Sequence, residues 1–474
     1  MRYGRRSALV LTAASALCLV SAFGGAAMAS PAGSVKGDPQ PERTPFKLGN
    51  LGASSSASIA MEPNGAMVVV YDIAVGDGRL QVCVLDRGPR KCTSKTVVDM
   101  PSGEDTTGSP EVFIPSANHV DVLQAESPGD TQLFSSTNGG KSFGSPVNVG
   151  DLDVGAAALV SNNIVFTTGD NGGGSQIESI PVGSPGVEPV TTVNSKTAYD
   201  VGVGDYRGGA LVGSDYEGPS IETTYVSYAP SGDNFNSQSS YHQVGSFGKE
   251  MLVGMSGDAL LTVQTQGKED MLLRLFNGRG FGASHVMPGG AGCTIGCSIT
   301  IDQDPSGAVH VFIERSAFDY DLVERTTTDG GSKWGGAVNL GNAISDGGFS
   351  AALDSRGTGL VIGTGNVLAY PVLAAQGVSL SLSRSSIRKG QTVTASGRVT
   401  PHDSGRSVQL QVEVGKNTWR NVTGAKATTK SGGSFSIKIK GNSAGSFTYR
   451  AVASDLAGYL LYGYSNGKSL HVTS

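Results

Sequence analysis

The chain has 474 residues, enough for two or three domains or one large repetitive domain, and its 69 glycines are about twice the usual share. Charged residues make up 16% of the chain, and no long run with helical apolar periodicity follows the first 30 residues. The composition therefore excludes a mainly helical protein. A net charge of −5 without a basic cluster argues against nucleic acid as the partner.

Residues 1–29 are predicted to be an export signal. Basic residues 1–6 precede the apolar stretch Ala8–Val20, and small residues end at Ala29, where we expect cleavage. The apolar stretch is shorter than the roughly 20 residues that span a bilayer, and no later stretch is more suitable. We therefore expect a secreted, extracellular chain without a transmembrane segment, in which residues 30–43 form a linker. The adjacent Arg5 and Arg6 leave a twin-arginine route open beside the favoured general secretory route.

Residues 44–375 contain a repeated unit of about fifty residues. The turn glycines Gly257, Gly307 and Gly357 are spaced fifty positions apart. The other copies centre on Gly65, Asn118, Asn162 and Gly208. Such a period, with about four short strands per unit, is typical of a β-propeller. We predict an all-β protein whose propeller has seven blades, with six as the alternative.

The two ends of the repeat region resemble each other. Residues 45–50 (PFKLGN) are similar to residues 337–342 (AVNLGN). We expect the first of these segments to be the outermost strand of the last unit, residues 359–373. This pairing would close the ring and remove its exposed edges.

Four cysteines remain after removal of the signal, in two local pairs. Export favours disulfides, Cys83 with Cys92 and Cys293 with Cys297. A metal site at Cys293 and Cys297 would need further ligands, and the histidines are scattered. We expect no metal and no cofactor, and we expect the second disulfide to restrain a glycine-rich loop at the functional end.

Two turns share the pattern Ser/Thr-x-Asp-x-Gly-x-x-Trp/Phe, with Asn in place of Asp in the first. In this pattern the Asx side chain accepts turn N–H groups, glycine permits positive φ, and the aromatic ring packs inward. The pattern residues are Ser136, Asn138, Gly140 and Phe143 in one turn and Thr327, Asp329, Gly331 and Trp334 in the other. The turns resemble the Asp-box, or BNR repeat, of the sialidase superfamily. The resemblance covers roughly residues 44–373 and implies a β-propeller with structural turns between the third and fourth strands.

Residues 376–474 have a different pattern. Segments 378–382, 408–412 and 435–439 alternate apolar and polar residues between glycine-rich turns, which predicts an Ig-like β-sandwich. Trp419 and Tyr449 are expected in its core. The segment resembles Ig-like modules of exported bacterial proteins, which commonly act as spacers or surface-adhering modules.

The expected strand order separates two ends of the propeller. The resemblance implies that Asp-box turns face away from the active site, so the loops at the opposite end would form the functional face. Asp302 and Asp304 resemble the start of a calcium loop but fall on a turn at the Asp-box end. The ligand-binding candidates on the functional face are Asp72, Asp215, Tyr216, Glu217, Glu314, Arg315, Asp319 and Tyr320. Carboxylates beside aromatic rings suit neutral sugars, while solvated loops, a cation site and a basic protein partner stay open.

The sialidase reaction is not expected from these residues. Sialidases hold the substrate carboxylate with three arginines and carry an Arg-Ile-Pro motif, whereas this chain lacks the motif and offers only Arg79 and Arg315 on that face. We predict a monomeric extracellular binding protein for a glycan, cell-wall polymer or protein. The alternative is a glycoside hydrolase, either exo-sialidase-like or using two carboxylates, whose catalytic pair the sequence does not identify.

Overall fold

The computed structural model describes residues 44–48, 56–73, 78–86, 91–101, 106–126, 130–151, 153–169, 175–183, 188–192, 198–217, 222–229, 240–243, 250–264, 270–288, 298–315, 321–342, 348–363, 367–373, 376–400, 404–415, 418–454 and 463–474. The predicted signal peptide, the linker and the Cys293–Cys297 pair lie outside these ranges. The described part is all-β, as predicted, and its single helical element is the 3-10 turn η1 (Ser431–Gly433). No helix within these ranges is long and apolar enough to cross a membrane.

Seven antiparallel sheets of four strands each lie between Phe46 and Val372 within the described ranges. Sheets 1 to 3 are β2 (Ala57–Met61), β3 (Met67–Asp72), β4 (Arg79–Leu85) and β5 (Ser94–Asp99); β6 (Thr106–Ser116), β7 (His119–Glu126), β8 (Asp130–Ser136) and β9 (Val147–Asp151); and β10 (Asp153–Val160), β11 (Asn163–Gly169), β12 (Ser175–Pro181) and β13 (Glu188–Thr192). Sheets 4 and 5 are β14 (Ala198–Tyr206), β15 (Gly209–Glu217), β16 (Glu222–Ala229) and β17 (Ser240–Gln243); and β18 (Glu250–Ser256), β19 (Ala259–Gln264), β20 (Asp270–Leu275) and β21 (His285–Val286). Sheets 6 and 7 are β22 (Ile299–Gln303), β23 (Val309–Arg315), β24 (Asp321–Thr327) and β25 (Val338–Asn342); and β26 (Phe349–Leu353), β27 (Gly359–Gly363), β28 (Leu368–Val372) and β1 (Phe46–Lys47).

Sheet 1 shows why these residues form strands. Every residue of β3 is buried, and its run of valines suits a pleated sheet packed on both faces. In the preceding turn, Asn64 Oδ1 accepts the amide of Ala66 at 2.7 Å, and Gly65 has φ +87°. An Asx side chain and a positive-φ glycine thus reverse the chain, and β3 pairs antiparallel with β2.

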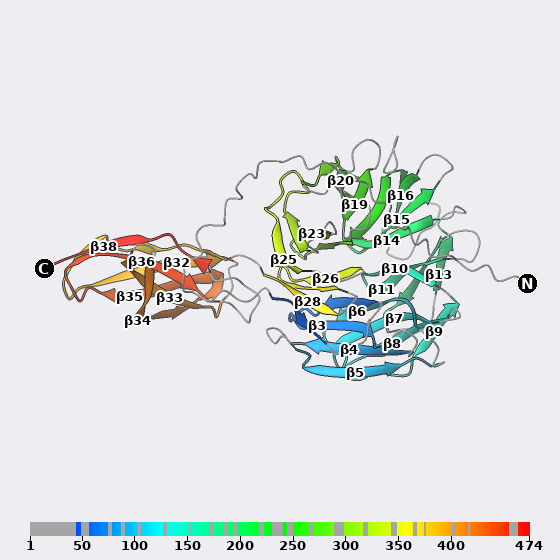
Figure 1. Ribbon diagram of the computed structural model, residues 1–474, viewed down its shortest axis with the longest axis horizontal. Helices are drawn as coiled ribbons and strands as arrows, with labels where there is room; N and C mark the ends of the chain where they lie inside the picture. The colour runs from blue at the N-terminus through cyan, green and yellow to red at the C-terminus, as the bar shows by residue number, and fades with distance from the viewer. Residues whose placement is uncertain are drawn as a thin grey trace, which may run out of the picture.

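The first strands of the sheets contact one another in a closed circle. Each packs against the first strand of the next sheet, from β2 through β6, β10, β14, β18 and β22 to β26, which again packs against β2. Later strands of the sheets lie farther out, and Figure 1 shows β5, β9 and β13 at the rim. The first strands therefore surround the centre of this part of the molecule.

The start of the described chain completes sheet 7. Phe46 of β1 pairs with Ala369 of β28, and the Leu48 amide donates to Val367 O at 3.3 Å. Leu48 packs in one apolar cluster with residues of sheets 1 and 7. The predicted pairing between the start and the end of the repeat region is confirmed.

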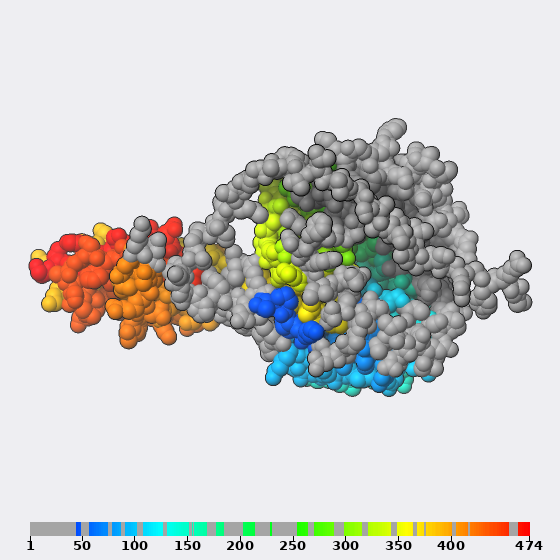
Figure 2. Space-filling view, viewed as in Figure 1, coloured from blue at the N-terminus to red at the C-terminus, as the bar shows by residue number. Residues whose placement is uncertain are grey.

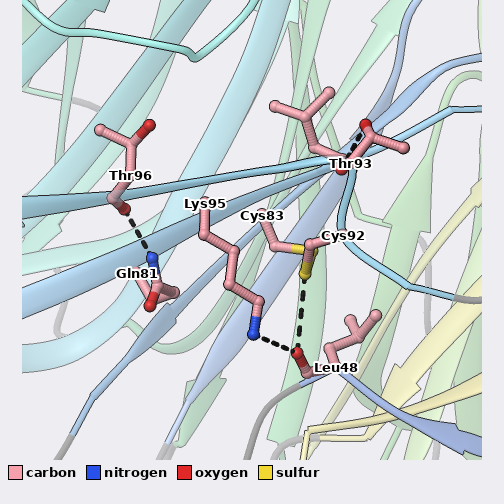
Figure 3. The surroundings of a disulfide bond; sticks show 8 residues. Leu48, Gln81, Cys83, Cys92, Thr93, Lys95 and Thr96 are labelled. Carbon is pink, nitrogen blue, oxygen red and sulfur yellow. Dashed lines mark hydrogen bonds between the residues drawn. A yellow bond between two sulfur atoms is a disulfide. The ribbon is translucent and has the colours of Figure 1, made fainter.

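A disulfide joins Cys83 and Cys92 beside this closing strand, as predicted. It links β4 to the turn before β5, and Cys83 is fully buried in the cluster that contains Leu48. Lys95 of β5 donates from Nζ to Leu48 O at 2.9 Å (Figure 3). The disulfide therefore cross-links sheet 1 at the place where this sheet contacts the segment that follows β1.

Residues from 376 onward form two further sheets, drawn apart from the first seven in Figure 1. One contains β29 (Gly377–Val378), β30 (Ser381–Leu382), β32 (Thr392–Thr400) and β35 (Ser434–Lys440). The other contains β31 (Ser386–Arg388), β33 (Ser407–Gly415), β34 (Thr418–Thr428), β36 (Gly445–Ala453), β37 (Gly463–Tyr464) and β38 (Lys468–Thr473). Their inward residues, such as Val393 and Ile437 of one sheet and Leu410 and Ala451 of the other, share one apolar core.

The two aromatic residues expected in this core have different environments. Tyr449 is buried in the cluster between the sheets. Trp419 is half-buried, and its ring lies 4.5 Å from the guanidinium of Arg450. Arg450 also lies 4.5 Å from the ring of Tyr464 and donates from Nε to Gln411 Oε1 at 2.7 Å. Cation–π contacts and this hydrogen bond therefore stabilise a buried arginine.

Candidate functional site

A polar channel of about 480 Å³ lies inside the circle of first strands, and all seven contribute to its lining. Small residues allow the strands to approach closely: a Cβ on Gly204 would lie 2.5 Å from Gly257 O. Hydroxyl and carboxyl groups supply the polar lining. They belong to Ser58, Ser109, Glu111, Asp205, Ser256, Thr300, Asp302 and Ser350.

Burial changes the acidity of two channel carboxyls, Glu111 and Asp302. Burial raises the pKa of Glu111 to about 7, an effect that the hydrogen bond with Ser58 opposes. Burial likewise raises the pKa of Asp302 to about 6, opposed by the charge of His310 and by a 3.4 Å hydrogen bond from Ser256 Oγ. Near neutral pH, Glu111 is thus partly protonated, so it can donate as well as accept a hydrogen bond.

Asp205 has a mainly structural environment in the same lining. Its Oδ1 accepts the amide of Gly208 at 2.9 Å, and its Oδ2 accepts the amide of Ser161 at 3.4 Å from sheet 3. Asp205 thus orders the turn after β14 and links two sheets.

The placement of Asp302 corrects one expectation. The sequence pattern assigned it to a turn at the end away from the functional site, whereas it is a strand residue of β22 whose side chain lines the channel. Glu111 of β6 was not among the candidates. The signal that could have found both is their position: each lies in the first strand of its repeat, and these strands line the centre.

Two predicted ligand-binding residues have described side chains, and both are buried. Asp72, at the end of β3, is 1% exposed and accepts a hydrogen bond from Ser56 Oγ at 2.8 Å. Glu314, near the end of β23, is 3% exposed. Burial of this degree favours structural roles for these two carboxyls.

The other predicted residues are placed only by their backbone or not at all. Asp215, Tyr216 and Glu217 end β15, next to the segment that begins β16, and Arg315 ends β23 opposite Asp321. Their side chains are outside the described part of the structure, as are Asp319 and Tyr320 entirely. A ligand-binding role for these residues stays a prediction.

Both Asp-box-like turns have a dense hydrogen-bond network. In the first, Asn138 Oδ1 accepts the amides of Lys141 at 3.1 Å and Ser142 at 3.0 Å, and Ser136 Oγ accepts the amide of Gly140 at 3.0 Å.

In the second turn, Asp329 Oδ1 accepts the Lys333 amide at 2.8 Å, and Thr327 Oγ1 accepts the Gly331 amide at 2.9 Å. The bond from the Lys333 amide is the main reason that the pKa of Asp329 lies below its ordinary value. Phe143 and Trp334 each pack, half-buried, against an apolar cluster that joins neighbouring sheets. Asn138 and Asp329 thus stabilise the same type of turn, and the Oδ1 atom of each accepts hydrogen bonds from backbone amides of its own turn.

A buried charged cluster lies at the turn end of sheet 6. His310 Nδ1 lies 2.8 Å from Glu324 Oε1, and His310 Nε2 lies 3.5 Å from Asp304 Oδ2. Burial lowers the pKa of His310, but hydrogen bonds and attraction from Asp304 and Glu324 outweigh it and raise the pKa to about 9. Asp304 Oδ1 also accepts the amides of Ser306 at 2.8 Å and Ala308 at 3.0 Å, which confirms the predicted structural turn.

Comparisons with known proteins do not assign the chain to a family. No family model and no curated protein matches the chain. An uncharacterized protein of Listeria monocytogenes EGD-e is similar in structure, with 14% identity, 68% of this chain and 93% of that chain covered, and a TM-score of 0.42. The β-propeller domain of the Trilobed protease from Pyrococcus furiosus has 8% identity, 67% and 94% coverage, and a TM-score of 0.42. An Aleuria aurantia lectin in complex with Fucα1-6GlcNAc has 14% identity, 61% and 97% coverage, and a TM-score of 0.37.

At these scores the likenesses support neither a family nor an activity for this chain. What the described residues define is an all-β protein with seven four-stranded antiparallel sheets around a polar channel and two further sheets after residue 376.

Proposed function

We propose that the chain is an exported seven-bladed β-propeller of sialidase-like type followed by an Ig-like β-sandwich. Seven four-stranded sheets, the closed circle of their first strands and the pairing of β1 with β28 support the propeller. The Asp-box-like turn networks support the sialidase-like type, and two sheets around one core support the sandwich. The signal sequence and the Cys83–Cys92 disulfide support an extracellular location.

The proposed function is extracellular binding of a neutral glycan in the central channel. The observation that best supports this function is the composition of the channel lining. The lining contains hydroxyls and partly protonated carboxyls, and no Arg or Lys occurs among its described residues. Sugar hydroxyls both donate and accept hydrogen bonds, so they match such groups, whereas an anionic sugar needs cations. A volume of about 480 Å³ is within the usual range of ligand pockets.

A glycan array probed with the chain lacking residues 1–29, followed by calorimetric titration, tests this proposal. We expect a neutral glycan to bind and Glu111→Gln to weaken its binding by about tenfold, since one channel hydrogen-bonding group changes. Asp329→Asn, in a turn away from the channel, is the matched control and should leave affinity unchanged. Absence of binding to every glycan, or equal affinity of Glu111→Gln, would overturn the proposal.

A glycoside hydrolase is the second candidate, favoured by the acidity of Glu111. A pKa near 7 is what a general acid for glycosidic cleavage requires, and Asp302 in the same channel supplies a second carboxyl. Reducing-end release from the glycans bound on the array would measure turnover. Hydrolysis by the unmodified chain that is abolished in Glu111→Gln would establish that the protein is a glycoside hydrolase. Binding of a glycan without release of reducing ends would instead support binding as the sole function.

A further inference from the structure

The charge of the chain is divided unevenly between its two parts. Residues 376–474 contain 13 Lys and Arg against three Asp and Glu, a net charge of +10, although the whole chain carries −5. The first 375 residues therefore carry −15. Among the described residues of the C-terminal part, Glu413 is the only acidic side chain. A strongly basic lobe is thus attached to a strongly acidic body.

A groove of about 660 Å³ lies on this basic lobe between β34 of one sheet and β35 of the other. Arg420, Lys438 and Lys440 line the groove and are exposed, and one acidic residue, the half-buried Glu413, lines it with them. Phe447 and Tyr449 supply apolar surface. Figure 2 shows the C-terminal strands as a lobe beside the larger part of the molecule. The groove therefore combines a cationic rim with an apolar wall.

The alternation of β35 produces the cationic rim. Phe435, Ile437 and Ile439 are buried in the core, which directs Lys438 and Lys440 outward. Two positions along a strand correspond to roughly 6.6 Å, so the ammonium groups form a row. Lysines also protect edge strands from aggregation. That role accounts for these two side chains but not for Arg420 across the groove or for a net charge of +10.

We propose that this groove binds a linear polymer whose charges are phosphate groups, such as a phosphodiester-linked polyol of a cell envelope. A row of cations matches repeated anions, and the apolar wall suits the carbon units between them. Lysine binds phosphate as a point charge, and the guanidinium fork of Arg420 also matches phosphate oxygens. The acidic first 375 residues would be repelled by the same polymer, so attachment through this lobe would direct the channel away from it.

Titration of the chain lacking residues 1–29 with poly(glycerol phosphate) tests the proposal. Lys438→Gln with Lys440→Gln should weaken binding by at least about tenfold at moderate salt. The matched control, Arg384→Gln with Arg398→Gln, removes two exposed charges outside the groove lining and should cost less than about threefold. The slope of log affinity against log salt should fall by roughly one and a half in the first variant alone.

Four results would overturn the proposal. Equal weakening by both variants would mean that charge acts diffusely rather than in the groove. Tighter binding of polygalacturonate would identify a carboxylate polymer, and tighter binding of duplex DNA would identify a nucleic acid. Salt-sensitive self-association without polymer, measured by sedimentation, would identify the acidic part of a second copy as the occupant. Glu111→Gln in the channel should leave polymer binding unchanged, so failure here is separable from failure of glycan binding.

Discussion

The buried His310 cluster makes the stability of the first seven sheets depend on pH above neutrality. The pKa of His310 is about 9 in the folded protein, against 6.5 for an unperturbed histidine. The folded state therefore holds this proton more tightly than the unfolded state. Its contribution to stability is fully present below pH 6.5 and is lost as the pH rises through about 9. The difference corresponds to on the order of 3 kcal/mol.

Two measurements check this value. Chemical denaturation of the chain lacking residues 1–29 at pH 7.5 and pH 9.5 should show the free energy of unfolding of these sheets falling by about 2 kcal/mol, which is the part of the His310 contribution that is lost above pH 7.5. NMR of the histidine ring carbons should show His310 titrating near pH 9. The raised pKa values of Glu111 and Asp302 also reduce stability as the pH rises, but in a window from about 4 to 7, so the two effects separate.

His310→Gln identifies the resonance and should remove the alkaline loss. Removing one member of a buried ion pair can itself cost about 3–5 kcal/mol, so the ring titration in the unmodified chain is the decisive measurement. A ring that titrates at pH 6.5 or below would refute the reasoning, because Asp304 and Glu324 would then not stabilise its charge.

Three further changes have distinct expected outcomes. Replacing both Cys83 and Cys92 by Ser should lower the free energy of unfolding by about 2–3 kcal/mol, and dithiothreitol should cost the unmodified chain about that much more than it costs the variant. Gly357→Ala should cost more stability than Gly307→Ala, because both glycines have positive φ but only the Cβ at 357 meets a ring, at 2.8 Å; equal midpoints in denaturant would contradict this. Asp329→Ala should lower the melting temperature, because the amide of Lys333 loses its acceptor, whereas Asp329→Asn should change it little, since the other turn already uses asparagine.

The strands and turns could be predicted because their signals are local. Buried runs such as Met67–Val70 and turn glycines such as Gly307 recur with a fixed period, and strand formation follows from them. The closing pair could be predicted because Pro45–Asn50 and Ala337–Asn342 resemble each other in sequence. Each of these features is visible within a few residues or by comparison of repeats.

The candidate site could not be predicted as well, because its residues meet only in three dimensions. Asp302 and Glu111 resemble ordinary solvent-facing positions of half-buried strands, and the circle of first strands is what turns them toward one channel. His310 lies in an apolar run, and its partners Asp304 and Glu324 come from a turn and from the neighbouring strand. The net charge of the whole chain likewise concealed the basic lobe, because the acidic part outweighs it.

The pairing of β1 with β28 sets the order in which the molecule can be completed. Residues 46 and 369 are neighbours in sheet 7 although 323 positions separate them. In the proposed export with the amino terminus first, β1 would leave the membrane pore long before β28. Strand β1 then stays without a partner while sheets 1 to 6 form, and an unpaired strand is a site of aggregation. Completion of sheet 7 therefore requires a long-range contact, which forms slowly because the entropic cost of closing the loop comes before the contact stabilises the chain.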